Sequence, residues 1–120
     1  MTASLFHLAL ARDWADAFVT GEYRASTIGA TLDEVGFIHL SYIHQVATTA
    51  DTFYRGRDDV MLLAIDPTRV DAEVRAEPAP GTGELFPHLY GPLPVVAVVG
   101  AYPLGLGADG ALDLTPHLGP

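Results

Sequence analysis

The sequence predicts a small α+β domain built from a mixed or antiparallel β-sheet and two helices. Its 120 residues fit one domain with a single hydrophobic core, and 49% of them are apolar, which excludes a disordered chain. Short apolar runs of strand length recur along the chain, and two segments change to the spacing of an amphipathic helix. Because strands and helices do not alternate regularly, we expect a mixed sheet rather than a parallel βαβ sheet.

The first predicted elements are a buried strand and a short helix. Residues 4–10 are mostly apolar and form the strand, with His7 near its middle. Asp13 is a candidate N-cap, and Gly21 is a candidate C′ residue because glycine readily adopts the left-handed conformation that ends a helix. The apolar residues that share one face of this helix are Trp14, Ala17 and Phe18.

A second strand and helix follow an irregular stretch at residues 22–30, where a short strand around Tyr23 is one interpretation. Residues 36–40 form an apolar strand interrupted only by His39, and Ser41 is placed to cap the next helix. The apolar stripe expected on that helix consists of Ile43, Val46, Ala47, Ala50, Phe53 and Tyr54.

The second half of the chain supplies the remaining strands. Residues 55–59 are predicted to form a turn, and residues 78–84 a loop rich in proline and glycine. Residues 85–93 are apolar and aromatic but are punctuated by two prolines, which makes this segment rigid. The strands expected here lie at residues 60–65, 74–77 and 95–102.

The chain divides into a domain at residues 1–104 and a C-terminal tail at residues 105–120. The tail is rich in glycine, alanine and proline and has no clear period. An edge strand at residues 111–114 is the one element expected in it.

Composition limits the classes of partner. Fifteen acidic residues against six arginines, with no lysine, give a formal charge of −9, so neither nucleic acid nor an anionic membrane surface is an expected partner. The absence of cysteine excludes disulfides and thiolate chemistry. The N-terminus does not resemble a signal peptide, so we expect a cytoplasmic protein that binds a small molecule, as a monomer or a homodimer.

His7 and His39 interrupt apolar strands and are candidate functional residues. A buried histidine needs partners for its ring nitrogens, so each of them is either a structural core residue or a ligand-binding one. For His39 the functional reading is stronger, because the strand ends there and a helix N-terminus beginning at Ser41 would offer free N–H groups to an anion. Alternation places His39 on the same side as Phe37 and Ser41.

The segment at residues 85–93 is the third candidate. If it is extended, His88 and Tyr90 point to the same side. The rings of Phe86 and Tyr90 could stack on a flat ligand. The alternative is a proline-bounded lid that only closes the core.

Three arginines are candidate binders of phosphate or carboxylate. Arg55 and Arg57 flank Gly56 in the turn after the second helix, and Arg24 is a third cation for the mouth of the same cleft. Pairing with nearby aspartates such as Asp51 is the alternative role.

Motifs for other chemistry are absent. His39 and His44 are five residues apart across a strand-helix junction, which matches no usual ligand spacing, so no metal is expected. His44 is expected to be a solvated helix residue. The chain has no Gly-x-Ser-x-Gly elbow, no phosphate-binding loop and no dinucleotide-binding glycine motif.

Six motifs together carry a likeness to a known family. They are Leu5-Phe6-His7, Gly21-Glu22-Tyr23-Arg24, Gly36-Phe37-Ile38-His39-Leu40-Ser41, Phe53-Tyr54-Arg55-Gly56-Arg57-Asp58-Asp59, Leu62-Leu63-Ala64-Ile65-Asp66-Pro67 and Glu84-Leu85-Phe86-Pro87-His88-Leu89-Tyr90-Gly91-Pro92-Leu93. The chain resembles the bacterial family known as domain of unknown function 952, over nearly its whole length up to Leu104.

This resemblance implies an ADP-ribosyltransferase-like fold, in which a split mixed β-sheet binds NAD in a central cleft. The nearest enzymes are RNA 2′-phosphotransferases, to which His7, the triplet His39-Leu40-Ser41, the turn Arg55-Gly56-Arg57 and the strand end Ile65-Asp66 are similar. The resemblance therefore implies that His7 and His39 contact the NAD riboses and that an arginine holds a phosphate.

Two departures leave the activity open. Transferases of this fold that modify proteins usually need a late-strand glutamate, and residues 95–102 contain no acidic residue. The RNA-directed enzymes need a basic surface, which this chain lacks. One hypothesis is a transferase or hydrolase acting on NAD or an ADP-ribose-like molecule, with His39, His88 and Arg57 as its catalytic residues. The alternatives are a non-catalytic module that binds a nucleotide or small ligand, and an enzyme of unrelated small-molecule chemistry in the same cleft.

Overall fold

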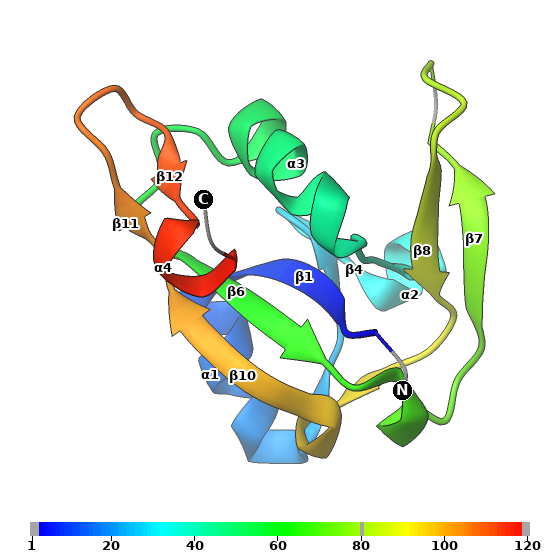
Figure 1. Cartoon of the computed structure of the whole chain (residues 1–120). Helices are drawn as coiled ribbons and strands as arrows, with labels where there is room; N and C mark the ends of the chain where they lie inside the picture. The colour runs from blue at the N-terminus through cyan, green and yellow to red at the C-terminus, as the bar shows by residue number, and fades with distance from the viewer. Residues whose placement is uncertain (1–2, 80, 119–120) are drawn as a thin grey trace.

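The computed structural model of the protein describes residues 3–79 and 81–118 (Figure 1). The helices of this part are α1 (Ala11–Thr20), α2 (Leu32–Val35), α3 (Val46–Phe53) and α4 (Thr115–Leu118), with 3₁₀ turns η1 (Ile43–Gln45), η2 (Pro67–Arg69) and η3 (Val95–Ala97). The strands are β1 (Leu5–Leu10), β2 (Glu22–Tyr23), β3 (Ala25–Thr27), β4 (Ala30–Thr31), β5 (Ile38–His39), β6 (Val60–Ile65), β7 (Val74–Pro78), β8 (Leu85–Leu89), β9 (Leu93–Pro94), β10 (Val98–Pro103), β11 (Gly105–Leu106) and β12 (Leu112–Asp113).

Two three-stranded antiparallel sheets form the body of the molecule. One has the strand order β1-β6-β10 and the other β5-β8-β7. β1 and β6 pair along their whole length, from Leu5 opposite Ile65 to Leu10 opposite Val60. The prediction of an α+β fold with antiparallel strands is confirmed, and the strand expected at residues 60–65 is β6 itself.

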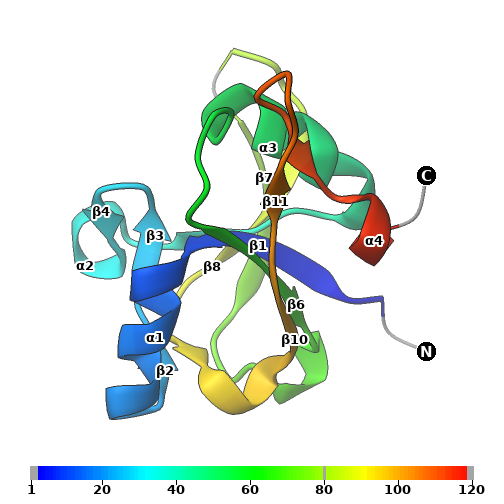
Figure 2. The same ribbon diagram turned by 90° about the vertical axis from the view of Figure 1, so that its left-hand side faces the viewer.

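The two sheets meet where β5 ends. The N–H of Leu40 donates to the carbonyl of Pro87 on β8 (3.0 Å), whereas Ser41 exchanges both backbone hydrogen bonds with Phe6 on β1 (2.7 and 2.9 Å). One short extended segment therefore pairs first with one sheet and then with the other. Figure 2 shows the result from the side, with α1 and α2 on one side of the molecule and α4 on the other.

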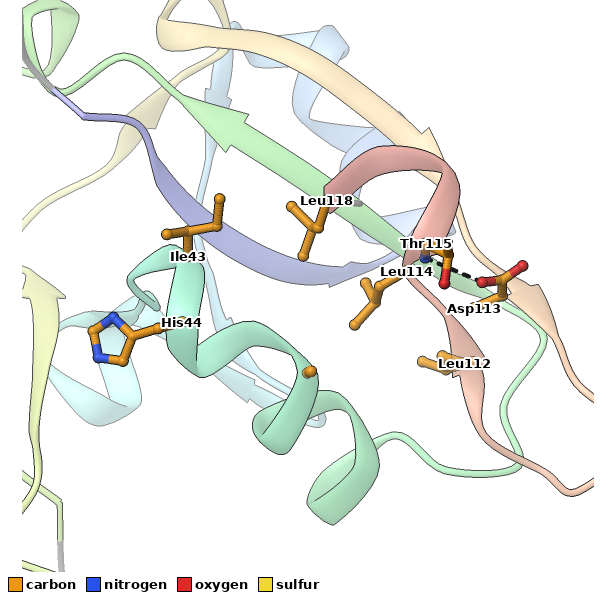
Figure 3. A pocket seen from close by; sticks show the side chains of 8 residues that line it. Ile43, His44, Leu112, Asp113, Leu114, Thr115 and Leu118 are labelled. Atoms are coloured by element: carbon orange, nitrogen blue, oxygen red, sulfur yellow. Dashed lines mark hydrogen bonds between the residues drawn. The ribbon is translucent and has the colours of Figure 1, made fainter. Parts of the chain in front are cut away.

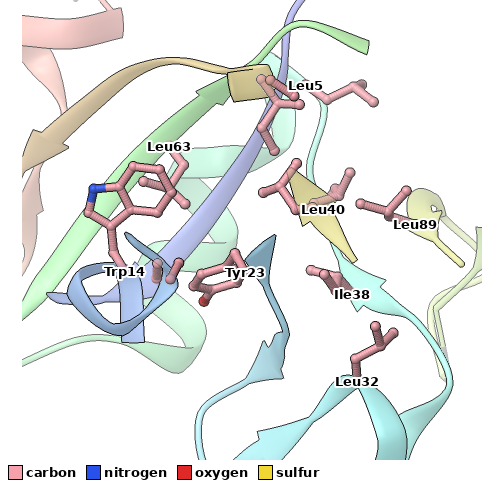
Figure 4. Packing of buried hydrophobic residues seen from close by; sticks show 13 residues of the cluster. Leu5, Trp14, Tyr23, Leu32, Ile38, Leu40, Leu63 and Leu89 are labelled. Atoms are coloured by element: carbon pink, nitrogen blue, oxygen red, sulfur yellow. The ribbon is translucent and has the colours of Figure 1, made fainter. Parts of the chain in front are cut away.

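The hydrophobic core has two parts, one on each face of β1. Alternation sends Leu5 and Ala9 to one face, against Trp14 of α1, and Phe6 and Leu8 to the other. Figure 4 shows the first part, in which residues from α1, both sheets and the short strands converge. All six residues of β1 are buried because both faces are covered, and each large side chain contributes roughly 1.5–3 kcal/mol by leaving water.

The prediction that Asp13 caps the first helix is wrong. α1 follows β1 directly, so Leu10 occupies the N-cap position and Asp13 lies in the first turn. The N–H of Ala11 donates to the carbonyl of Asp59 (2.8 Å), which satisfies one of the free amides without a side-chain cap. The predicted end is confirmed, since Gly21 adopts φ 84° and donates its N–H to Ala17.

The prediction that Ser41 caps the second helix is also wrong, because its backbone is used in the bridge to Phe6. Gln45 accepts from the N–H of Tyr42 (3.0 Å), and α3 begins only after the η1 turn. This later start changes the buried face of the helix. Val46, Ala50 and Tyr54 are buried, while Ile43, Ala47 and Phe53 of the predicted stripe are exposed.

Residues 85–89 form the central strand of the second sheet rather than a lid. β8 accepts a proline because Pro87 still supplies its carbonyl to Leu40, although it has no N–H to donate. The segment is therefore extended, which is the condition under which His88 and Tyr90 were expected to point to the same side.

The C-terminal segment packs on the domain instead of leaving it. β11 and β12 pair in a hairpin, and Leu112, Leu114 and Leu118 contact the part of the core that contains Val46. The division placed after residue 104 is not a break in the packing. None of the helices in the described residues combines the length and the apolar character needed to cross a membrane.

Candidate functional site

The outer face of the β5-β8-β7 sheet brings together histidine, charged and aromatic side chains. His39, His88 and Arg75 lie directly opposite one another across the three strands. Glu77 lies opposite Phe86 in the same ladder, two residues along from Arg75 and therefore on the same face. We call this group, together with Phe37 and Tyr90, the outer-face cluster.

The rings of the outer-face cluster shield the imidazole of His88. Phe37 stacks on it with the centroids 4.0 Å apart and the planes at 17°. His39 meets it edge-on, with centroids 5.3 Å apart and planes at 83°. The ring of Tyr90 packs at a tilt against that of Phe37, with centroids 5.4 Å apart. As a result His88 is only 7% exposed.

Glu77 orients this imidazole. Nδ1 of His88 lies 2.9 Å from Oε1 of Glu77, and the hydroxyl of Tyr90 donates to the same oxygen. These two hydrogen bonds, from Tyr90 first and His88 second, hold the pKa of Glu77 below its ordinary value, so the carboxylate is ionised at neutral pH. Since an ionised carboxylate only accepts, Nδ1 of His88 carries the hydrogen.

The second nitrogen of His88 is available to a ligand. Nε2 has no hydrogen-bond partner among the described residues, and no buried side-chain nitrogen or oxygen in this part of the chain is left unsatisfied. Nε2 must therefore reach solvent, with its lone pair unprotonated in the neutral ring. A mostly buried imidazole with one open lone pair and a carboxylate behind it has the arrangement of a general base.

His39 adds a second imidazole that is open to solvent. Partial burial, and then the neighbouring His88, lower the pKa of His39 below its ordinary value. His39 is therefore neutral at pH 7 and can accept or relay a proton.

Arg75 completes the row without making it cationic. Its guanidinium lies over the ring of Tyr90, 4.3 Å from the centroid, and pairs with Glu73 at 3.0 Å. Within the cluster the charges of Arg75 and Glu77 cancel when the histidines are neutral, and the salt-bridge partner Glu73 brings the local net charge to −1.

His7 lies in the core and not on this face. It is 3% exposed, its Nδ1 lies 2.6 Å from the carbonyl oxygen of His39, and its Nε2 lies 2.8 Å from the hydroxyl of Tyr23. Both nitrogens are used internally, which leaves none for a ribose, so the structure favours the structural alternative for this residue. Burial lowers the pKa of His7 to about 4 and keeps the ring neutral.

The predicted cations do not gather at the histidines. Arg24 pairs with Asp33 at 3.0 Å, Arg55 with Asp51 at 3.1 Å, and Arg57 with Asp59 at 2.8 Å. The turn that carries Arg55 and Arg57 bonds to Gly110 of the C-terminal segment, on the other side of the molecule from β8 (Figure 1). Ser41 is buried in its β-bridge and offers no helix N-terminus.

These positions do not fit NAD as the resemblance implied. The pyrophosphate of NAD needs an unpaired cation or helix N-terminus beside the ribose ligands. In the described residues His7 is enclosed, the three predicted arginines are paired elsewhere, and the outer-face cluster has a net charge of −1 once Glu73 is included.

The sequence predicts only some members of the outer-face cluster as site residues. His39, His88, Tyr90 and Phe86 are brought to one face as predicted candidates, with Phe86 half-buried at the edge of the cluster. No local sequence pattern marks Glu77, Arg75 or Phe37 as a site residue. The signal for the first two was period-two alternation in residues 74–77, which can be used only once the pairing of β7 with β8 is known.

A separate groove lies between η1, α3 and the C-terminal segment (Figure 3). It has a volume of about 450 Å³ and is lined mainly by apolar side chains, with His44, Asp113 and Thr115 as its polar members. None of the predicted site residues lines it. The described residues contain no group of three or more His, Cys, Asp or Glu side chains arranged to hold a metal ion.

Comparisons with known proteins place the chain among uncharacterised relatives. The sequence profile described as "Protein of unknown function (DUF952)" matches residues 8–101. The crystal structure of protein CC0527 from Caulobacter crescentus is 33% identical, aligns over 97% of this chain and 98% of its own, and superposes with a TM-score of 0.84. The solution NMR structure of CC0527 is 32% identical over 97% of both chains, with a TM-score of 0.80. No curated protein matches the sequence significantly.

Proposed function

This chain belongs to the DUF952 family of proteins of unknown function, and we propose that it is an enzyme that acts on a small molecule at the outer-face cluster. The observation that carries the proposal is the hydrogen bond from Nδ1 of His88 to Glu77, which leaves Nε2 as an oriented base beside His39. The reaction type that fits is a hydrolysis or a group transfer that needs proton movement.

The proposed step uses His88 first as a base and then as an acid. Nε2 accepts the proton of a water or of a substrate hydroxyl as the oxygen attacks, and the imidazolium is stabilised by Glu77. The same proton then moves to the leaving group as its bond breaks, so the ring ends the cycle neutral. General acid–base catalysis of this kind typically contributes about 10²–10⁴ in rate.

The charges and rings of the cluster select the class of substrate. The cluster and Glu73 together have a net charge of −1, on a protein with a formal charge of −9, and this repels an anion such as a free phosphate ester. The exposed parts of Phe37 and Tyr90 favour contact with a flat ring. We therefore expect an uncharged or weakly basic ring compound, such as a nucleoside or a free base.

Thermal-shift measurements with matched ligand pairs test this class. The pairs are adenosine with AMP, adenosine with ADP-ribose, and nicotinamide with NAD. A ligand that binds only the folded protein raises the melting temperature. We expect the uncharged member of each pair to give the larger rise. Rises confined to AMP, NAD and ADP-ribose would reverse the assignment of charge, and the absence of any rise at millimolar ligand would reject the class.

Product analysis then separates catalysis from binding. The stabilising ligand is incubated with the wild type, His88→Gln and His44→Gln, and products are identified by mass spectrometry. We expect turnover to fall by about 10² or more in His88→Gln and to persist in His44→Gln, whose exposed imidazole lies outside the cluster. Equal turnover in all three proteins would exclude His88 as the base.

A non-catalytic ligand-binding module is the second candidate. It is favoured because much of the polar capacity of the cluster is used by internal contacts. Tyr90 and His88 share the carboxylate of Glu77, and Arg75 is stacked on Tyr90. For this candidate the same ligand raises the melting temperature but remains chemically unchanged, and His88→Gln weakens the rise.

A further inference from the structure

The strand that carries His39 is paired on one edge only. The backbone groups of Ile38 and Leu40 face β8, where Ile38 lies opposite Leu89 and the N–H of Leu40 donates to Pro87. By the alternation of an antiparallel ladder, the backbone groups of residues 37, 39 and 41 face away from β8. They point into the split between the two sheets, where a neighbouring strand is available only to residue 41.

Side chains replace the missing strand at the other two positions. The carbonyl oxygen of Phe37 accepts from Oγ of Ser26 at 2.5 Å, and that of His39 accepts from Nδ1 of His7 at 2.6 Å. Ser41, the third residue, is paired with the backbone of Phe6. The carbonyls of residues 37, 39 and 41, which face away from β8, thus accept from a hydroxyl, an imidazole and a backbone amide, respectively.

The imidazole of His7 is held from its other end as well. Because Nδ1 must donate to a carbonyl, Nε2 of the neutral ring accepts from the hydroxyl of Tyr23 at 2.8 Å. Tyr23 is fully buried and meets the ring edge-on at 5.1 Å. The low pKa of His7, caused by burial, is consistent with a ring that stays neutral in this chain of bonds. His7 is therefore a rigid link between the core and the main chain of β5.

Both carbonyls held in this way belong to residues of the outer-face cluster. Phe37 stacks on His88, and His39 meets it edge-on. A buried carbonyl left without a donor costs about 1–3 kcal/mol, so a strand that lost His7 would shift until the oxygen found another partner. Such a shift would move the side chain of His39 relative to His88.

We propose that His7 is a positioning residue for the outer-face cluster, and that it fixes the imidazole of His39 beside His88 by bonding the His39 carbonyl in place of a strand. This inference rests on the proposed function only in that the proposed function makes the outer-face cluster catalytic. The placement it describes concerns two rings and can be measured without a substrate.

The experiment follows the ring nitrogens of His39 and His88 by ¹⁵N NMR during a pH titration. His7→Leu removes the donor to the carbonyl. His7→Asn keeps a donor, since an asparagine amide can occupy the position of Nδ1. Tyr23→Phe is the matched control, because it removes the other hydrogen bond of His7 and leaves the one to His39.

We expect His7→Leu to move the titration midpoint of His39 by about half a pH unit or more, and His7→Asn to restore most of it. Tyr23→Phe should lower the melting temperature while leaving that midpoint in place. If His7→Leu lowers the melting temperature and both histidines titrate as in the wild type, His7 is a purely structural residue and the proposal is wrong.

Ser26→Ala provides a second variant should His7→Leu not fold, since it removes the equivalent donor at Phe37. We expect the ring resonances of His88 to shift in it, because Phe37 stacks on that ring. Unchanged His88 resonances would contradict the positioning role. A shift in either variant, together with no turnover in the wild type, would retain the positioning and reject the catalytic function instead.

Discussion

His39 and His88 lie directly opposite each other on β5 and β8, with their ring centroids 5.3 Å apart and their planes nearly perpendicular. They are 49 residues apart in the chain, and the pairing of two short antiparallel strands alone brings them together. The carboxylate of Glu77 orients the ring of His88 through a hydrogen bond, and the buried imidazole of His7 bonds the main-chain carbonyl of His39.

Acid is expected to destabilise the protein through His7. Its pKa is about 4 in the folded protein, against an ordinary value of 6.5, so the unfolded chain binds more protons between these values. His7 therefore disfavours folding increasingly as the pH falls from 6.5 to 4, by roughly 3 kcal/mol in total. Urea denaturation of the wild type and His7→Asn at several pH values measures this. The variant should show a flatter profile over that window, and His44→Gln should keep the wild-type slope.

Replacing Glu77 by glutamine should remove a contribution to stability that exists only at higher pH. The pKa of Glu77 is lowered in the folded protein, so its carboxylate stabilises the fold above the ordinary value of 4.5 and the contribution is lost as the pH falls through the folded pKa. Melting temperatures of Glu77→Gln and the wild type should differ at pH 7 and converge below pH 4.5. The control is Glu73→Gln, on an exposed pair with Arg75, which should change stability by no more than about 0.5 kcal/mol. A constant gap for Glu77→Gln at all pH values would contradict this.

Two leucines of β8 should respond very differently to truncation. Leu89 is fully buried on the core side of the strand, whereas Leu85 is 50% exposed. Leu89→Ala is expected to lower the free energy of unfolding by about 2–5 kcal/mol, and Leu85→Ala by less than about 1 kcal/mol. Denaturant unfolding of both variants tests whether β8 is the central strand of its sheet. Similar losses would indicate that the segment is not seated in the core.

The C-terminal hairpin should contribute to the stability of the whole domain. Leu112 is 9% exposed and packs with Val46 and Leu62, while Leu106 on the same hairpin is 43% exposed. Leu112→Ala is expected to cost about 2 kcal/mol and Leu106→Ala about 0.5 kcal/mol or less. Thermal unfolding of the two variants provides the comparison. An unchanged melting temperature in Leu112→Ala would show that residues 105–118 are a dispensable tail.

Local signals in the sequence were sufficient for the elements whose pattern is complete within a few residues. The uninterrupted apolar run of β6 gave a strand with the observed bounds, and Gly21 ended α1 because the left-handed conformation favours glycine. The two N-caps failed for a reason that a local pattern cannot contain. The N–H of Ala11 donates to the carbonyl of Asp59, and the backbone of Ser41 pairs with that of Phe6. Both partners come from distant parts of the chain.

The candidate site divides in the same way. The sequence by itself singled out His39, His88, Tyr90 and Phe86 as candidates, and alternation along an extended segment placed His88 and Tyr90 on one side. It favoured His39 over His7 only through a helix N-terminus expected at Ser41, which the structure does not form. Which histidine is enclosed and which is open, which arginines are paired, and that Glu77 lies beside His88 were decided by the tertiary structure alone. The physical reason is that burial and hydrogen-bond partners are set by strand pairing between residues far apart in the chain, and no local spacing records them.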